Sequence, residues 1–505
     1  MSIFKIKQFD FQLILLSLLP IAFVVGPLIV EILVNILILI FLYSSVKNKD
    51  FYFLKNKIFI FFFIFYIFLI INLLSSDLYS ETALNVFSYI RFFLFPFAIF
   101  EILKKNKNNL KFVFIILLIT IFVVVLDGYY QFVFDKNFFG YEKYRIDRIS
   151  GFFKDDLILG SYLSRLLPLF IGLIIFFKND IKLTWFSLLI FFITYILIFL
   201  TGERASFLTA SLTLLIILIQ IRTFFYIRII MSIASVSVLT FLMLYNPIML
   251  DRHFNQMKNH ILSYSESSTI LPYYMPMFQT SLKMFNDQKL FGYGPKSYRY
   301  YCDKEKFVSY FPQPIQLDNT IVKMPYNWKE KNYMVISEFF IREGDIIEKG
   351  DRILSYRYID NKDLKVLFSN KEGRINKIIN QSRYMNGETV MKIIPQYSPN
   401  FEFVRKNSCN THPHNFYLQL LAETGFVGFI FIFSLFIYLL YLLIIRKRSY
   451  CDSEICILVG FFVVLWPLTT NGNFFNNWIN LISFYPLGFL LYIMNEKVKE
   501  GKKIV

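Results

Sequence analysis

The sequence predicts an all-α polytopic membrane protein of about 12 transmembrane helices, with one long polar segment that carries a small inserted β domain. Hydrophobic residues make up 56% and aromatic residues 20% of the 505 residues, and the mean hydropathy of +0.50 lies far above that of soluble proteins. Apolar stretches long enough to cross a bilayer recur along the chain. Basic residues gather in alternate connections between them, which is typical of multi-pass membrane proteins.

Apolar windows define the predicted spans. They cover residues 11–27, 29–46, 57–74, 84–103, 111–130, 158–177, 183–201, 205–221, 225–245, 416–444, 455–470 and 479–494. The first window is preceded by basic residues, as in a signal peptide. It lacks a small-residue cleavage site and a second apolar run follows at once, so we expect an uncleaved first span.

The charge of the connections predicts the orientation. Every even-numbered span is followed by a basic cluster, such as Lys47 and Lys49 after the second and Arg446–Arg448 after the tenth. Cytosolic connections are enriched in this way, so both termini are predicted to be cytosolic and the segment from about 246 to 414 to lie outside. The same clusters account for the formal charge of +17, and we expect no nucleic-acid partner.

The spans divide the chain into parts. Residues 1–245 carry the first nine predicted helices, and residues 246–415 form the outer segment. Residues 314–396 form a β domain inserted into that segment. Residues 416–505 carry the last three helices and a cytosolic tail.

The inserted domain shows alternating apolar and polar residues with Gly-Asp and Asn-Gly turns, as in Glu343–Leu354 and Gly373–Ile393. These two halves are quasi-repeated, and the pattern resembles the lipoyl/biotinyl-like sandwich that also occurs in membrane-fusion proteins. Lys362 falls near the place of the carrier lysine in that fold. The enzymes that modify such lysines are cytosolic, so we favour a spacer or docking role for the domain.

Cysteine usage argues against a metal site. The chain has four cysteines and no C-x-x-C pair, too few for a metal cage. Cys302 and Cys409 both fall in the outer segment, where a disulfide could close its base. The alternative is two free thiols, because the pairing depends on geometry that sequence does not give.

The stretch Thr411–Gly428 holds two of the four histidines, at the point where the outer segment re-enters the membrane. Asn415 is a good N-cap residue, so a helix is expected to begin there. Asn415, Gln419 and Glu423 then share one face of an apolar helix, which predicts that this face points inward. His414 would lie at its water-accessible end, and a neutral imidazole there is suited to take a proton from a hydroxyl.

Several stretches resemble the O-antigen ligase superfamily, polytopic enzymes that move lipid-linked glycans to an acceptor at the outer side of the inner membrane. His414-Asn415, followed after nine residues by Gly425-x-x-Gly428, resembles its histidine signature. Thr201-Gly202-Glu203-Arg204-Ala205 resembles its second signature, in which a small residue usually stands at the place of Glu203. Leu290–Ser297 and Arg148–Leu163 resemble further loops of the family. The resemblance covers most of the membrane core but not residues 314–396.

The resemblance implies roles for basic residues that depart from the charge pattern. Arg204, with Arg148 and Arg91, would hold the diphosphate of the donor, because guanidinium groups bind such anions in a bidentate manner. Arg252 and Arg299 are candidates for a further phosphate-binding arginine. For each arginine the alternative is snorkelling or an ion pair, for instance of Arg204 with Glu203.

The implied function is transfer of a glycan from an undecaprenyl diphosphate-linked donor to a lipid A-core acceptor, at the periplasmic face of the bacterial inner membrane. His414 and Arg204 would be the catalytic residues, while Asn415 and Glu423 orient groups around His414. No nucleotide motif or acidic metal cluster is apparent in the sequence, so we expect a glycosyltransferase that uses neither a cofactor nor a metal.

Other functions remain open at this point. Within the superfamily, a repeat-unit polymerase and a protein O-oligosaccharyltransferase differ from a ligase only in the acceptor. A transporter of lipid-linked sugars would also have many spans and inward arginines, but it would place polar residues through the bilayer midplane. A receptor or scaffold that uses its β domain to bind a partner would hardly need so many spans.

Overall fold

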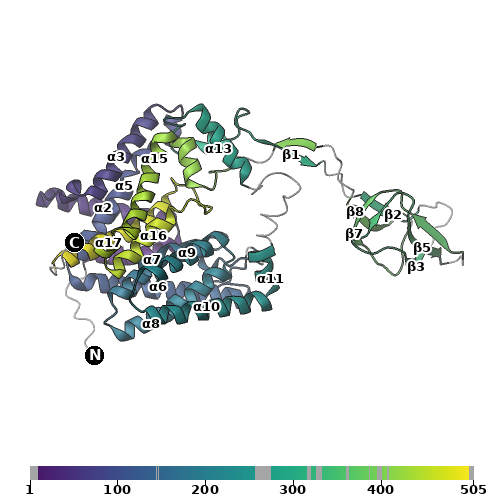
Figure 1. Ribbon diagram of the computed structural model, residues 1–505, viewed down its shortest axis with the longest axis horizontal. Helices are drawn as coiled ribbons and strands as arrows, with labels where there is room; N and C mark the ends of the chain where they lie inside the picture. The colour runs from purple at the N-terminus through teal and green to yellow at the C-terminus, as the bar shows by residue number, and fades with distance from the viewer. Residues whose placement is uncertain are drawn as a thin grey trace. The chain divides into compact units, whose positions relative to one another are not determined.

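The computed structural model describes residues 10–143, 145, 147–255, 274–314, 320–325, 333–359, 363–385, 387–394, 401–405 and 409–499. Lys362, discussed above, lies outside the described residues. The chain forms two compact units, one of Met1–Ser309 with Asn407–Val505 and a second of Tyr310–Lys406. The first unit is helical and the second consists of strands (Figure 1).

Helices occupy every predicted apolar window of the first unit. They are α1 (Phe11–Val25), α2 (Pro27–Asn48), α3 (Lys57–Leu74), α4 (Tyr79–Phe87), α5 (Ile90–Lys104), α6 (Lys107–Phe134), α7 (Leu159–Phe176), α8 (Ile181–Leu200), α9 (Arg204–Gln220), α10 (Phe225–Tyr245), α11 (Pro247–Leu250), α13 (Met275–Asp287), α14 (Tyr298–Tyr301), α15 (Phe416–Ile444), α16 (Asp452–Val464) and α17 (Asn477–Lys499). Short 3-10 or π-helical turns lie at Tyr52–Lys55, Gly151–Phe153, Asp251–Asn255 and Lys447–Ser449.

Nine helical segments within the described residues are long and apolar enough to cross a membrane, so the chain is a multi-pass membrane protein. The other three predicted spans coincide with shorter helices. Helices α1, α9 and α16 have 15, 17 and 13 residues, which is fewer than a straight crossing of about 20 residues needs.

Helix α7 lies at the centre of the bundle, where it packs against α8, α9 and α16. In its most apolar window 83% of the residues are buried, whereas in α10 the share is only 11%. Helix α10 is nevertheless strongly apolar. An apolar helix that the protein does not cover fits a lipid-facing position, so α10 belongs to the periphery and α7 to the core.

A close backbone approach joins α15 to the loop that precedes α14. Gly425 interrupts α15 with a φ of 63° and a ψ of −165°. At this kink the Phe426 N–H donates to the Lys289 carbonyl at 2.8 Å. A Cβ on Gly292 would lie 2.6 Å from the backbone nitrogen of Gly425. The 290–297 stretch and the Gly425-x-x-Gly428 motif therefore meet in one contact, which holds loop 289–297 against α15 at its kink.

Replacing Gly425 with alanine should destabilise the protein by about 2 kcal/mol or more, because this backbone conformation is essentially restricted to glycine. The new Cβ would also lie 2.3 Å from the Leu290 carbonyl oxygen. Thermal unfolding in detergent measures the effect, with Val427→Ala as the matched change on the same helix. Equal unfolding temperatures for the two variants would contradict the account of the kink.

The second unit consists of short antiparallel strands. They are β1 (Tyr310–Pro314), β2 (Thr320–Lys323), β3 (Met334–Phe339), β4 (Ile346–Ile347), β5 (Arg352–Tyr358), β6 (Lys365–Phe368), β7 (Gly373–Ile378), β8 (Thr389–Ile394) and β9 (Phe401–Arg405). The sheet orders are β2-β8-β7-β4, β3-β5-β6 and the two-stranded β1-β9. In the register, Met334 pairs with Tyr358, and Ile375 with Ile393. The β character of the insert agrees with the sequence, whereas its likeness to a lipoyl-type sandwich stays a prediction.

A disulfide joins Cys302 to Cys409, across a sequence separation of 107 residues. Both cysteines belong to the first unit and flank the chain segment that forms the second. The bond therefore ties together the two ends of the first unit at the insertion. Cys451 and Cys456 are free thiols.

Candidate functional site

A cavity of about 610 Å³ in the first unit gathers most of the basic residues that the sequence singles out. Its walls come from the 148–158 loop, α7, the start of α9, the histidine segment and the connection between α16 and α17. Its charged and imidazole side chains are Arg148, Asp156, Arg165, Glu203, Arg204, Arg252, His412 and His414. With four guanidinium groups against two carboxylates, the lining carries net positive charge and favours an anion.

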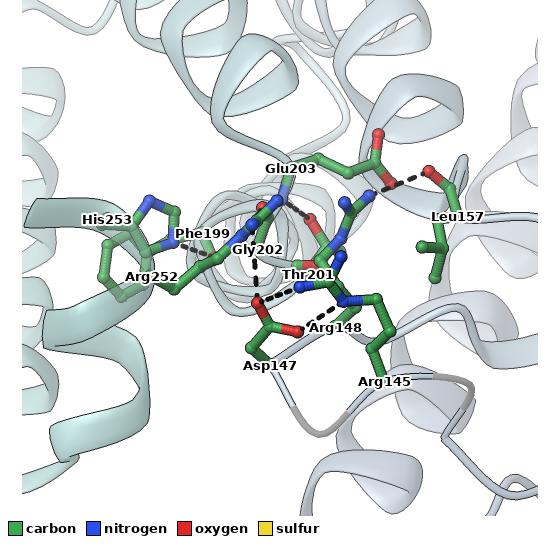
Figure 2. A network of polar contacts seen from close by, with 10 residues as sticks. All are labelled: Arg145, Asp147, Arg148, Leu157, Phe199, Thr201, Gly202, Glu203, Arg252 and His253. Atoms are coloured by element: carbon green, nitrogen blue, oxygen red, sulfur yellow. Dashed lines mark hydrogen bonds and ion pairs between the residues drawn. The ribbon is translucent and has the colours of Figure 1, made fainter. Parts of the chain in front are cut away.

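The turn between α8 and α9 orients two of these arginines. The Arg148 Nε donates to the Thr201 carbonyl at 3.2 Å, and the Arg252 Nε donates to the Gly202 carbonyl at 2.9 Å (Figure 2). Gly202 has a φ of 68°, and a Cβ there would lie 2.4 Å from the Asp147 carbonyl oxygen. Glycine is needed because the 147–148 backbone approaches the turn so closely.

The Asp147 carboxylate contacts two arginines of the same cluster (Figure 2). Its carboxylate lies 3.4 Å from the Arg252 Nη1 and accepts from the Arg145 Nε at 3.0 Å. Burial opposes ionisation of this carboxyl, but the hydrogen bond from Arg145 and the charge of Arg252 lower its pKa below the usual value. Burial and the nearby charges of Arg148 and Arg204 lower the pKa of Arg252 to about 10. A bound anion would relieve this mutual repulsion.

Arg204 begins α9 and lines the cavity directly. Within the described ranges its side chain makes no hydrogen bond or ion pair, so the predicted alternative of a pair with Glu203 is not formed there. Arg148 and Arg252 are held by carbonyl groups, whereas Arg204 retains its full set of donors for a ligand.

Glu203 instead holds the beginning of α7. Its Oε1 accepts from the Gly160 N–H at 2.8 Å and its Oε2 from the Ser161 N–H at 3.0 Å. The Ser206 hydroxyl donates to the same Oε2 at 2.9 Å. Burial raises the pKa of Glu203, and the charge of Arg148 with these hydrogen bonds opposes that rise. A glutamate thus stands where a small residue is usual in the family, and it accepts hydrogen bonds from N–H groups at the N-terminus of α7 that have no acceptor within the helix.

Replacing Glu203 with alanine should lower the free energy of unfolding by about 1–2 kcal/mol, because two N–H groups at the start of α7 lose their acceptor. The midpoint of thermal unfolding in detergent measures this. The matched control is Glu81→Ala, at an exposed residue in the first turn of α4. A shift no larger than that of the control would show that Glu203 does not support α7.

The two histidines of the 411–414 segment lie against each other, with ring centroids 4.2 Å apart. His414 has a φ of 57°, a left-handed conformation that is uncommon outside glycine. Its backbone carbonyl accepts from the Asn471 N–H at 2.9 Å, and its Nε2 lies 3.2 Å from the Asn410 amide nitrogen. Burial lowers the pKa of His414, while burial and the nearby His414 lower that of His412 to about 4. Both rings are therefore neutral near neutral pH and can accept a proton.

Four predicted residues do not line the cavity: Arg91, Arg299, Asn415 and Glu423. Arg91 is not among the residues that line the cavity; its Nη2 lies 3.7 Å from Glu31 of α2. Asn415 caps α15, accepting from the Tyr417 N–H at 3.0 Å. Glu423 is fully buried and accepts backbone N–H groups from the 296–298 loop, as described below. The predicted inward face of α15 is thus present, and the partners that these two residues have in the structure are protein groups.

Arg165, which the sequence places near the outer end of a predicted span as a further possible diphosphate ligand, lines the cavity from α7. Its Nε lies 3.2 Å from the Ser161 hydroxyl, one helical turn earlier. The available signal was a basic residue on an otherwise apolar span, which normally points toward a polar interior. His412 also lines the cavity, although the resemblance pointed only to His414.

The site can be compared with known families. The family model described as O-antigen ligase matches residues 188–324. This match supports membership of the O-antigen ligase superfamily, which the sequence signatures also indicate. The matched O-antigen ligase region contains the Thr201–Arg204 turn, Arg252 and the loop at Gly292, and it ends before the histidine segment. No match was found among curated proteins.

The O-antigen ligase family implies lipid-linked glycan substrates and a membrane setting. The described residues contain no group of three or more His, Cys, Asp or Glu side chains that could hold a metal ion. The charged and imidazole groups that the geometry brings together around the cavity are mainly those of arginines and histidines.

Proposed function

We propose that the protein is a glycosyltransferase that moves a glycan from an undecaprenyl diphosphate-linked donor to a hydroxyl of a lipid A-core acceptor. The observation that carries the proposal is the cavity that brings Arg148, Arg204 and Arg252 together with His412 and His414. These residues come from segments far apart in the sequence. A cluster of cations beside neutral imidazoles is what a diphosphate leaving group and a hydroxyl nucleophile require.

In the proposed reaction, the acceptor hydroxyl oxygen attacks the anomeric carbon of the donor sugar. The bond from that carbon to the diphosphate oxygen breaks, and the lipid diphosphate leaves with the bonding electrons. Arg204, with the oriented Arg148 and Arg252, stabilises the charge that develops on the leaving group. His414 accepts the proton of the attacking hydroxyl.

The proposed location is the bacterial inner membrane, with both termini in the cytosol and the cavity open to the periplasm. The basic clusters after alternate spans support this orientation. The Cys302–Cys409 disulfide supports it too, because such bonds persist in oxidising compartments. We further propose that α1, α9 and α16 complete about 12 crossings, together with the nine longer spans found among the described residues.

A transfer assay in proteoliposomes tests the proposal. The intact protein receives a lipid diphosphate-linked glycan together with a lipid A-core acceptor, and the products are separated by mass. Ligated acceptor is the expected product, formed equally in the presence of a chelator. Elongation of the glycan on its own lipid would instead identify a polymerase, and a glycosylated peptide would identify a protein O-oligosaccharyltransferase. Movement of the donor across the bilayer without any new bond would identify a transporter.

The pH dependence of transfer should report a buried histidine base. Only the neutral ring accepts a proton, so the rate falls as the pH drops through the pKa of His414, which burial places below its ordinary value of 6.5. The groups around this ring are His412, Tyr274 and Asn410. The initial rate under limiting acceptor, measured over a pH series, should therefore be flat near neutrality with an acid limb centred below about pH 6.5. An acid limb centred above that value would contradict the assignment.

A further inference from the structure

A second group of cationic side chains lies outside the lining of the arginine cavity. Lys296 and Arg299 belong to the loop before and within α14, and Arg91 belongs to α5. Arg299 and Arg91 both act electrostatically on Lys296, and Arg299 also acts on His412. Two carboxylates also act on Lys296, namely Glu423 and Glu31, and Glu31 pairs with Arg91.

A chain of hydrogen bonds fixes this loop relative to the histidines. The Lys296 and Tyr298 N–H groups each donate to the Glu423 carboxylate at 3.0 Å. The Gln419 Nε2 donates at 3.0 Å both to Glu423 and to the Asn473 side chain. Asn473 donates in turn to the carbonyl of Thr411, the neighbour of His412, at 3.2 Å. Glu423 and Gln419 of α15, together with Asn473, therefore link the cationic loop to the histidine segment through hydrogen bonds.

Lys296 stands where the backbone would favour glycine, since its φ is 62°. Its Nζ donates to the Asn85 side chain of α4 at 2.7 Å. Burial and the charge of Arg299 lower the pKa of this lysine to about 8. An ammonium group has three donors, so two remain after the bond to Asn85. The Lys296 ammonium group is thus held by a strained backbone and has N–H donors that are not used by Asn85. This combination fits a role in ligand binding better than a purely structural role.

We propose that Lys296 and Arg299 bind an anionic group, a phosphate or a carboxylate, on the acceptor glycan. The inference rests on the proposed function, in which the arginine cavity already holds the diphosphate of the donor. A second cationic group coupled to the same histidines would place an anionic acceptor with its hydroxyl at His414. The acceptor class is then a negatively charged glycan, and charge on the acceptor becomes a determinant of specificity.

The test uses the full-length protein in vesicles of phosphatidylcholine, with two acceptor glycolipids that differ only by one phosphate on the sugar. The variants Lys296→Met and Arg299→Gln should raise the KM for the phosphorylated acceptor about tenfold, the effect of losing one charge-assisted contact. Their kcat, and their KM for the neutral acceptor, should stay near those of the intact protein. Lys304→Met, on a neighbouring lysine that packs over Tyr301, is the matched control.

The outcomes separate this inference from the proposed function. Product from the intact protein with equal KM for both acceptors would overturn the acceptor site alone. Equal losses with both acceptors in the Lys296 and Arg299 variants would assign these residues a structural role and overturn it as well. A response only to added phosphatidylglycerol would replace the acceptor by an anionic lipid headgroup. No product with any acceptor would overturn the proposed function, and the inference with it.

Discussion

Replacing Arg204 with alanine should lower kcat for glycan transfer by about 10²–10³-fold, the usual cost of removing one preorganised donor from a developing negative charge. Arg204 lines the cavity and, within the described part of the chain, its side chain makes no hydrogen bond or ion pair. Its loss therefore leaves the neighbouring protein contacts intact. Single-turnover rates in proteoliposomes measure the effect with donor and acceptor in excess over their KM.

Two comparisons make the Arg204 result specific. Arg222→Ala changes an exposed arginine just after the opposite end of α9 and should leave the rate unchanged. Arg204→Lys retains the charge but not the planar pair of donors, so it should recover only part of the activity. Full activity of Arg204→Ala would remove this arginine from the site.

Replacing His414 with asparagine should lower kcat by about 10²–10⁴-fold, the range expected for loss of a general base. Asparagine suits the test better than alanine because the backbone at this position has a φ of 57°, which asparagine tolerates. The thermal unfolding midpoint should therefore stay close to that of the intact protein. The acid limb of the pH profile should disappear together with the rate.

The paired variant His412→Asn tests which ring takes the proton. Both rings line the cavity, and the resemblance of the sequence favours His414. If His412→Asn lost as much activity as His414→Asn and retained its stability, the two histidines would act as a unit. If His412→Asn alone were inactive, the assignment of the base would move to His412.

The sequence predicts those parts of the structure that depend on local periodicity and charge. The apolar windows predict the helices, and Asn415 marks the beginning of α15 because its side chain satisfies N–H groups only two and three residues away. The apolar windows do not fix the length of every helix. Helix α9 begins only at Arg204, directly after the turn that orients Arg148 and Arg252. With 17 residues it is shorter than a straight span of about 20.

The sequence cannot predict which polar groups meet across the bundle. The spacing of Gln419 and Glu423 indicates one inward face, and Gln419 does donate to Glu423. The other two donors to Glu423 are backbone N–H groups more than one hundred residues earlier in the chain. Arg91 and Arg148 look alike as isolated arginines near the outer interface. Only the fold pairs Arg91 with Glu31 and brings Arg148 to the Thr201 carbonyl.

The central claim is that the arginine cavity holds the diphosphate of a lipid donor. Its most direct test is equilibrium binding of a radiolabelled polyprenyl diphosphate to the purified protein in detergent, without acceptor and therefore without chemistry. The account predicts binding that the glycan-linked donor competes away and that Arg204→Ala weakens about tenfold or more, while Arg222→Ala leaves it unchanged. Equal affinity of the intact protein and the Arg204 variant, or no preference for a diphosphate over a monophosphate, would contradict it.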